Sequence, residues 1–279
     1  MDIIRKLAEE LQIRPGQAQA AVKLIDEGNT IPFISRYRKE ATGALNDEVL
    51  RNLYERLNYL RNLEEKKEQV ISSIEEQGKL TDALKQQILA AETLVAVDDL
   101  YRPYRPKRRT RATIAKERGL EPLALYILSG QGKAAVPVEA EKYVDEAHEV
   151  PDVKTAIQGA EDIIAETMSD SAALRAWIRR KSVQEGCIVS AARTKQQAAE
   201  HSVYDNYYAY SEPIRKIPGH RVLAMNRGEK EGFLKVALDV DKEKAQQLVR
   251  YGFVQQTGSP ACRYVAQACD DAYTRLIAP

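Results

Sequence analysis

The sequence predicts a mainly helical protein with a minor pair of β-strands, and three observations support this fold class. Apolar residues recur at intervals of three and four along most of the 279 residues, as on the buried face of a helix. Capping residues such as Asp, Asn and Thr precede many of these segments, and glycine often follows them. Alternation of apolar and polar residues, the pattern of a strand, is clear only from Leu234 to Val240.

Three short helices are predicted near the N-terminus, beginning after Asp2, Gly16 and Thr30. Short helices joined by tight turns suit helix-turn-helix packing, in which the third helix, Phe33 to Glu40, would be the recognition helix. That helix carries the basic residues Arg36, Arg38 and Lys39. Many helical bundles begin in the same way without touching DNA, so a purely structural role stays open.

The longest helix is predicted to begin at an Asn46 cap and to run to about Gln77. Its apolar positions step by three and four, apart from a polar interval between Leu63 and Val70. About 30 residues at 1.5 Å each give a helix about 45 Å long, which can serve as a spine for other helices. The charged run Glu64 to Glu68 marks the side that we expect to face solvent.

Further helices are expected over residues 81–89, 120–128, 138–148, 152–168, 170–185, 242–251 and 260–277, and a short one that ends at Arg118 with Thr110 or Thr113 as its cap. The segment 94–100 is expected to lead into the basic residues that follow it. A lone strand needs a partner, and Gly186 to Ser190 is the segment nearby that could pair with Leu234 to Val240. Before Pro213 the chain holds Tyr204, Tyr207, Tyr208 and Tyr210. These rings could stack on bases or pack one lobe against another, and the acidic neighbours Asp205 and Glu212 favour packing.

Positive charge is concentrated in one segment. Between Leu100 and Arg118 lie eight basic residues and one acidic residue, whereas the whole chain has a net charge of only +1. Such a concentration suits phosphate binding. Pro103 and Pro106 favour extended backbone at the residues before them, so the segment Arg102–Arg111, called the basic strap below, should begin as a non-helical connection. Its predicted nucleic-acid contacts are Arg102, Arg105, Lys107, Arg108, Arg109 and Arg111.

The basic strap has two compatible interpretations. Tyr101 and Tyr104 alternate with the arginines, a mixture that can stack on bases while it pairs with phosphates. Segments of this composition also cross helical lobes within a protein, where guanidinium groups cap helix C-termini and pair with acidic helix faces. The strap is therefore predicted either to hold the protein together, to contact a nucleic acid or acidic partner, or to do both.

The remaining composition argues against several classes of function. No segment has about twenty uninterrupted apolar residues, and Met1 leads directly into a charged segment, so we expect a cytoplasmic protein without a membrane partner. Cys187, Cys262 and Cys269 are expected to be free, buried thiols, because three cysteines cannot pair completely and they lack metal-ligand spacing. The three histidines lie in separate segments, and the acidic clusters lie on helix faces or caps. We expect no catalytic residue, metal or cofactor.

Three blocks of sequence resemble the bacterial Tex family of transcription accessory proteins. The first runs from Thr30 to Gly43, and the second, from Asp99 to Thr110, contains the basic strap. The third combines Tyr210 to Arg221 with Arg227 to Gly232. These strings are long and nonrepetitive, and the helices between them keep the order of the family, so the resemblance covers essentially the whole chain.

The resemblance implies the N-terminal part of a longer, mostly helical protein that continues into an RNase H-like domain, helix-hairpin-helix modules and a C-terminal OB-type barrel. We expect two lobes, residues 1–110 and 111–279, truncated before the RNase H-like domain. The predicted function is a noncatalytic module of a transcription accessory protein. In it Arg36, Arg38, Lys39 and the basic strap contact DNA or RNA phosphates independently of sequence. The alternative is a helical scaffold that binds polymerase or ribosome-associated proteins, while absent C-terminal domains bind nucleic acid.

Overall fold

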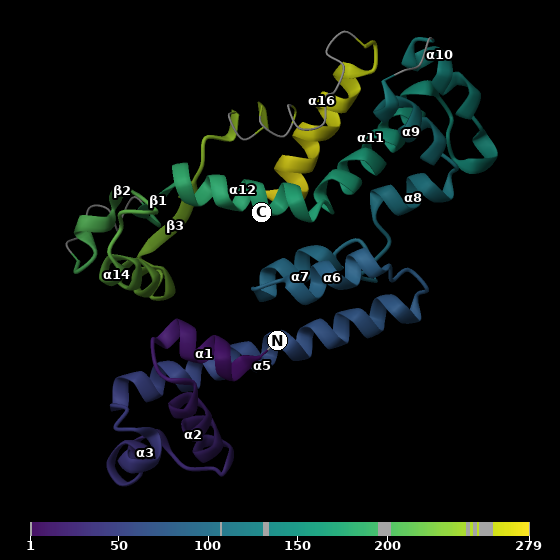
Figure 1. Cartoon of the computed structure of the whole chain (residues 1–279). Helices are drawn as coiled ribbons and strands as arrows, with labels where there is room; N and C mark the ends of the chain where they lie inside the picture. The colour runs from purple at the N-terminus through teal and green to yellow at the C-terminus, as the bar shows by residue number, and fades with distance from the viewer. Residues whose placement is uncertain are drawn as a thin grey trace. The chain divides into compact units, whose positions relative to one another are not determined.

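The computed structural model in Figure 1 describes residues 2–106, 108–130, 134–194, 202–243, 246–247, 250 and 259–278. As predicted, the fold is mainly helical with a small antiparallel sheet. The chain divides into two compact units, Met1–Tyr104 and Arg105–Pro279, and this division falls inside the basic strap. The lobe boundary expected after residue 110 stays a prediction, because a division by compactness does not identify a domain that folds alone.

The N-terminal unit is helical. It contains α1 (Ile3–Leu11), α2 (Pro15–Asp26), α3 (Ile31–Tyr37), α4 (Lys39–Thr42), α5 (Asp47–Glu76), α6 (Asp82–Ala90) and α7 (Leu94–Tyr101). The predicted caps Asp2, Asn46 and Thr81 each accept a hydrogen bond from a backbone N–H in the first turn of their helix. None of the helices among the described residues is long and apolar enough to cross a membrane.

Helix α5 supports two hydrophobic cores along one stripe. Leu50, Leu53, Leu57 and Leu60 pack with α1, α2 and α3. Leu63, Val70 and Ile74 pack with α6 and α7. The spine that the apolar spacing predicted is therefore present, and it spans the 30 residues from Asp47 to Glu76.

The expectation that Lys67 faces solvent is wrong. Its side chain is buried at 2% exposure, because it occupies the position of the apolar stripe between Leu63 and Val70. The Lys67 ammonium donates hydrogen bonds of 2.9 Å to the Glu64 carboxylate and of 2.9 Å to the Leu89 carbonyl oxygen near the end of α6. A buried cation is tolerated when it is paired and hydrogen-bonded in this way.

The predicted third helix, Phe33 to Glu40, is interrupted. Helix α3 ends at Tyr37, and Arg38 leaves the helical region with φ −128° and ψ 28°. Helix α4 begins at Lys39 and ends where Gly43 adopts a left-handed conformation. The basic residues of this segment thus lie around a break between two short helices, which a continuous recognition helix would lack.

The C-terminal unit is built around α11, which packs against α8, α9, α10 and α16. Its helices are α8 (Arg111–Glu117), α9 (Glu121–Ser129), α10 (Val136–Ala140), α11 (Val153–Ser169), α12 (Ala172–Glu185), α14 (Gly219–Lys230) and α16 (Cys262–Asp271), which continues into the π-helical turn η4 (Ala272–Ile277). The 3₁₀ turns are η1 (Glu141–Tyr143), η2 (Glu146–His148) and η3 (Asp205–Tyr207).

Two helix predictions in this unit have different outcomes. The helix expected over 138–148 is wrong beyond Ala140, since η1, η2 and an isolated bridge between Asp145 and Val150 take its place. The helix expected over 242–251 lies largely outside the described residues.

The sheet has the order β2-β1-β3, with β1 (Cys187–Ala192) between β2 (Ala209–Pro213) and β3 (Leu234–Asp239). The predicted pairing of β3 with the segment after Gly186 is confirmed, with Ser190 opposite Val236. Sequence reasoning missed β2. The tyrosines do pack, since Tyr204 is buried with Met225 and the other three rings lie against the same cluster within the C-terminal unit. Their expected packing of one lobe against another stays a prediction.

Gly159 allows α11 to lie close to Ala115 of α8 and to Leu120, which directly precedes α9. A Cβ atom at Gly159 would overlap Leu120 Cδ1 and lie 3.3 Å from Ala115 Cβ, and both neighbours are buried. Gly159→Ala should therefore lower the free energy of unfolding by about 1–3 kcal/mol through overpacking. Urea denaturation followed by circular dichroism would measure this change.

Gly16→Ala is the matched control, since no described atom lies within 4 Å of its added Cβ and Gly16 belongs to α2. Alanine there should leave stability unchanged or raise it by up to about 1 kcal/mol. Equal effects of the two substitutions would contradict the close approach at Gly159.

Candidate nucleic-acid interface

The tyrosines of the strap region are structural. The Tyr101 hydroxyl lies 2.9 Å from the Ser73 hydroxyl, and the Tyr104 carbonyl oxygen accepts a hydrogen bond of 3.0 Å from the Gln77 side chain. Both rings pack against the second core of α5. They are therefore partly buried anchors within the N-terminal unit, and they do not form an open stacking platform for bases.

The strap begins differently from the prediction. Arg102 has helical backbone angles, φ −51° and ψ −42°, although Pro103 follows it. Its N–H bonds to the Asp98 carbonyl oxygen, so α7 carries on to this residue. The restriction that proline places on the preceding residue is a preference, and the packing of Tyr101 and Tyr104 overrides it here. The described residues from Arg105 to Thr110 are non-helical, as expected.

Most basic side chains of the strap are exposed. Arg105, Arg108 and Arg111 are exposed, and no ion pair joins Arg105 or Arg108 to a described residue. Arg109 pairs with Glu117 at 2.8 Å, yet 67% of its side chain stays accessible. Arg102 is only partly exposed, and Lys107 lies outside the described residues.

Arg111 begins α8, whose N-terminal backbone is capped by the Thr110 hydroxyl. It lines a pocket of about 490 Å³ together with Arg118, Lys154 and Asp162. Arg118 forms an ion pair of 2.7 Å with Glu149. Because the pocket contains charges of both signs, it does not by itself define an anion site.

Sequence reasoning missed Arg118 and Lys154 as neighbours of the strap. Arg111 and Arg118 are seven residues apart, and residues at that spacing lie on the same face of a helix. This spacing was a usable signal for Arg118. Lys154 comes from α11, and no local pattern connects it to α8.

The second predicted set of contacts surrounds the break between α3 and α4. Arg36, Arg38 and Lys39 are all exposed. The Arg38 guanidinium lies over the Phe33 ring, 5.2 Å from its centroid, and the Tyr37 side chain is 67% exposed. The structure therefore brings these three cations together beside accessible aromatic surface within the N-terminal unit.

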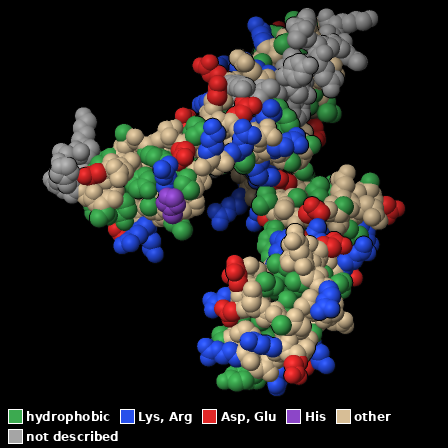
Figure 2. Space-filling model, turned by 60° about the vertical axis from the view of Figure 1, so that its left-hand side comes forward, with side chains coloured by type: hydrophobic (Ala, Val, Ile, Leu, Met, Phe, Trp, Pro, Cys, Tyr) green, Lys and Arg blue, Asp and Glu red, His purple; other side chains and the backbone are tan. Residues whose placement is uncertain are grey.

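Charge on the molecular surface is mixed. Figure 2 shows Lys and Arg side chains on the visible face of both units, with Asp and Glu side chains among them. The strap and the α3–α4 break are therefore local basic features, and the face in view does not form one continuous basic surface.

The described residues offer little support for a metal site or for a reactive thiol. Within the described ranges, no three His, Cys, Asp or Glu residues lie close enough together to hold a metal ion. Cys187, Cys262 and Cys269 are free thiols, as predicted, but the expected burial is wrong for Cys187 and Cys262, which are half-buried. Burial raises the pKa of the Cys269 thiol to about 12, and its sulfur lies 3.6 Å from Met168 Sδ, so this thiol is poorly nucleophilic.

These features define a class of protein: a mainly helical chain of two units whose basic strap lies at their division. A family model for the Tex-like protein N-terminal domain matches residues 1–75, and one for the Tex central region-like domain matches residues 133–278. The chain belongs to the Tex family.

Several curated relatives are similar to most of the chain. An uncharacterized protein of Bacillus subtilis, YdcI, is 42% identical over 99% of the chain and 38% of its own length. The transcriptional accessory protein Tex of Neisseria gonorrhoeae is 47% identical over 85% of the chain and 31% of its own length. The human S1 RNA-binding domain-containing protein 1 is 26% identical over the whole chain and 29% of its own length. The chain therefore spans about a third of the length of these relatives.

A separate acidic cluster lies between α11 and η4. Asp162 is buried and forms an ion pair of 3.3 Å with Arg275, which also pairs with Asp271. Oxygen Oε1 of Glu161 is buried and has no hydrogen-bond partner in the described part of the chain. Burial, together with the negative charges of Asp162 and Asp271, raises the pKa of Glu161 to about 7.

Glu161 should therefore make stability depend on pH. Its pKa is raised from 4.5 in the unfolded chain to about 7, so the folded state binds more protons in this window, and stability is lost as the pH rises through it. Glu161→Gln should raise the free energy of unfolding by about 1–2 kcal/mol at pH 8, a figure reduced for solvent screening, and should change it little at pH 4. Urea denaturation at both pH values would test this.

Glu68→Gln, on the exposed side of α5, is the control. It should change the free energy of unfolding by less than about 0.5 kcal/mol at either pH. A gain from Glu161→Gln that is the same at pH 4 and pH 8 would contradict the role of burial and charge.

Proposed function

We propose that the chain is a noncatalytic, cytoplasmic module that binds DNA or RNA through phosphate contacts, without reading bases. The observation that carries the proposal is the exposure of Arg105, Arg108 and Arg109 in non-helical backbone. Membership of the Tex family supports it, as do relatives named for transcription and for an S1 RNA-binding domain. The contacts assigned to the module are Arg36, Arg38, Lys39, Arg102, Arg105, Lys107, Arg108, Arg109 and Arg111.

Guanidinium chemistry fits this role. Arginine donates several hydrogen bonds in a fixed fork that matches phosphate oxygens, and it stays charged at physiological pH. Arg105 and Arg108 have no described ion-pair partner to leave, so binding a phosphate breaks no internal pair. Arg109 would exchange Glu117 for phosphate at an exposed position, where an ion pair contributes little.

The residues beside these cations support contacts that do not read the bases. Tyr101 and Tyr104 are packed against α5, and the broken α3–α4 segment offers only short helices to a major groove. Contacts made only to phosphates position a nucleic acid but carry no sequence information. Affinity should therefore be similar for different sequences of equal length.

The alternative function is a helical scaffold for polymerase or ribosome-associated proteins. Ion pairs inside the chain favour it in part, because Arg109 and Arg118 bind Glu117 and Glu149. In that case the strap would hold the chain together or bind an acidic protein, and regions of the protein outside this chain would bind nucleic acid.

Reversing the strap charges should distinguish the two functions. The triple variant Arg105→Glu, Arg108→Glu and Arg111→Glu should weaken binding of a labelled 20-base-pair duplex by at least about tenfold at 50 mM salt. The slope of log K against log salt should become shallower by about 0.9 for each phosphate that the variant no longer binds. Fluorescence anisotropy titrations with duplex and single-stranded DNA and RNA measure both quantities.

The control for the strap is an equal charge reversal elsewhere, Lys23→Glu, Lys79→Glu and Lys85→Glu, at exposed positions of the N-terminal unit. This control should keep most of the affinity and the original salt slope. Undetectable binding by the unmodified chain at 50 mM salt, or an equal weakening in both variants, would refute the strap as a phosphate-binding segment and favour the scaffold.

The α3–α4 cations can be tested separately. Arg36→Glu, Arg38→Glu and Lys39→Glu together should weaken binding by a similar factor on duplexes of two unrelated sequences, because phosphate contacts are indifferent to sequence. A weakening on one sequence only would instead indicate that this segment reads bases.

A further inference from the structure

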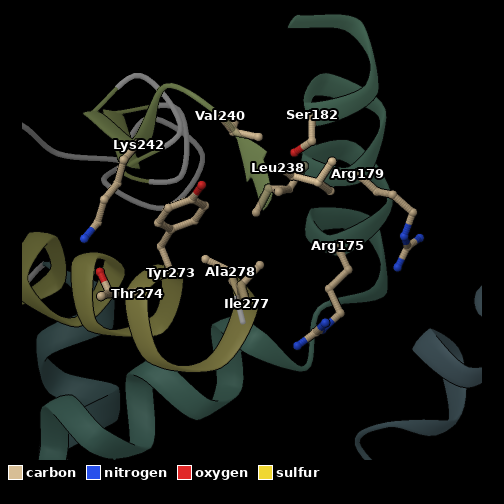
Figure 3. Close-up of a pocket in the computed structure, with 11 residues that line it drawn as sticks. Arg175, Arg179, Ser182, Leu238, Val240, Lys242, Tyr273, Thr274, Ile277 and Ala278 are labelled. Carbon is tan, nitrogen blue, oxygen red and sulfur yellow. The ribbon is translucent and has the colours of Figure 1, made fainter. Parts of the chain in front are cut away.

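A groove of about 580 Å³ in the C-terminal unit lies where α12, the end of β3 and η4 meet. Its middle is apolar, with Leu238 and Val240 on one wall and Ile277 on another. Figure 3 shows Lys242 at one end of this groove and Arg175 at the other, while the Arg179 side chain, which also lines it, extends away along α12. None of the described residues that line it is acidic.

One of these cations is held in place by the fold. Arg175 donates hydrogen bonds to the Ser169 carbonyl oxygen at the end of α11, at 2.6 Å, and to the Leu276 carbonyl oxygen of η4, at 2.9 Å. These bonds fix its guanidinium at the wall of the groove. The positive end of the groove is thus preformed.

The adjoining strand has a free edge. Strand β3 pairs with β1 on one side only, and its odd-numbered residues face β1, as the hydrogen bond between Arg193 N–H and the Phe233 carbonyl oxygen shows. The backbone N–H groups of Val236 and Leu238 therefore point outward. A Glu229 carboxylate oxygen accepts from the Val236 N–H at 3.1 Å.

Leu238 has no such cover. Among the described residues, none hydrogen-bonds its outward N–H or carbonyl group, and its side chain is 64% exposed. Unpaired backbone on an edge strand is a template for another strand, and proteins normally protect it. Here Glu229 covers the N–H of Val236, but the next outward N–H, that of Leu238 at the groove, has no partner among the described residues.

We propose that β3 and this groove form a docking site for an extended acidic peptide segment of a partner protein. The peptide adds a strand at Leu238, so that its main chain pairs with the outward N–H and carbonyl groups. An apolar side chain of the peptide fills the space between Leu238 and Ile277, and its carboxylates face Lys242 and Arg175. A peptide fits better than a nucleic acid, because only a peptide main chain matches the spacing of a strand edge.

The test uses the whole chain and a display library of random ten-residue peptides, selected on the immobilised protein. Selected peptides should be enriched in Asp and Glu next to an apolar residue. Fluorescence anisotropy with the best synthetic peptide should show that Lys242→Glu raises Kd by about tenfold or more, since it turns an attraction into a repulsion. Hydrogen exchange at the Leu238 amide should slow when the peptide is bound.

Two further variants sharpen the result. Leu238→Pro removes the outward N–H and leaves the β1–β3 hydrogen bonds. It should therefore also weaken peptide binding, while the circular dichroism spectrum stays unchanged. Lys230→Glu carries the same charge change at an exposed position of α14 and should leave Kd unaltered.

Several outcomes would overturn the proposal. Selection of no peptide, or of peptides without acidic residues, would do so. Equal effects of Lys242→Glu and Lys230→Glu would also reject it. Protection of the Leu238 amide by a ten-nucleotide single strand, with displacement of the peptide, would identify a nucleic-acid site in its place.

Discussion

An α-helix can bury only a stripe of its surface, and each unit of this chain is built around one long helix that meets this constraint. Helix α5 carries two cores in succession, and α11 gathers the helices of the C-terminal unit. A continuous stripe along α5 must pass position 67, which holds a lysine. The hydrogen bonds from Lys67 to Glu64 and Leu89 resolve that conflict, because they satisfy the buried ammonium and tie α6 to the spine.

In the strap region, buried side chains support the fold, whereas exposed side chains are available to contact a ligand. Tyr101 and Tyr104 face inward and fasten the end of α7 to α5, while Arg105, Arg108 and Arg109 project from non-helical backbone. The two interpretations of the strap therefore apply to different side chains. A segment anchored by its aromatic rings can present guanidinium groups without ordering them anew for each ligand, which lowers the entropy lost on binding.

Local signals in the sequence predicted much of the fold. Caps at Asp2, Asn46 and Asp152 and the apolar spacing of α5 are properties of neighbouring residues, so they are readable without a structure. Strand β2 was missed because its Ala-Tyr-Ser-Glu-Pro sequence lacks apolar alternation and depends on pairing with β1. The break at Arg38 and the burial of Lys67 are also set by tertiary packing. For the candidate interface, sequence located the cations, but exposure and ion pairing required the fold.

The position of the division between the units has a practical consequence for proteolysis. Trypsin cleaves after an accessible arginine or lysine outside regular secondary structure, and Arg108 and Arg109 are exposed and non-helical in the described part of the strap. Arg102 and Arg105 are each followed by proline, which blocks cleavage. The exposed arginines that suit a phosphate thus also form a protease site, and cleavage there would leave α5 in one fragment of the chain and α11 in the other.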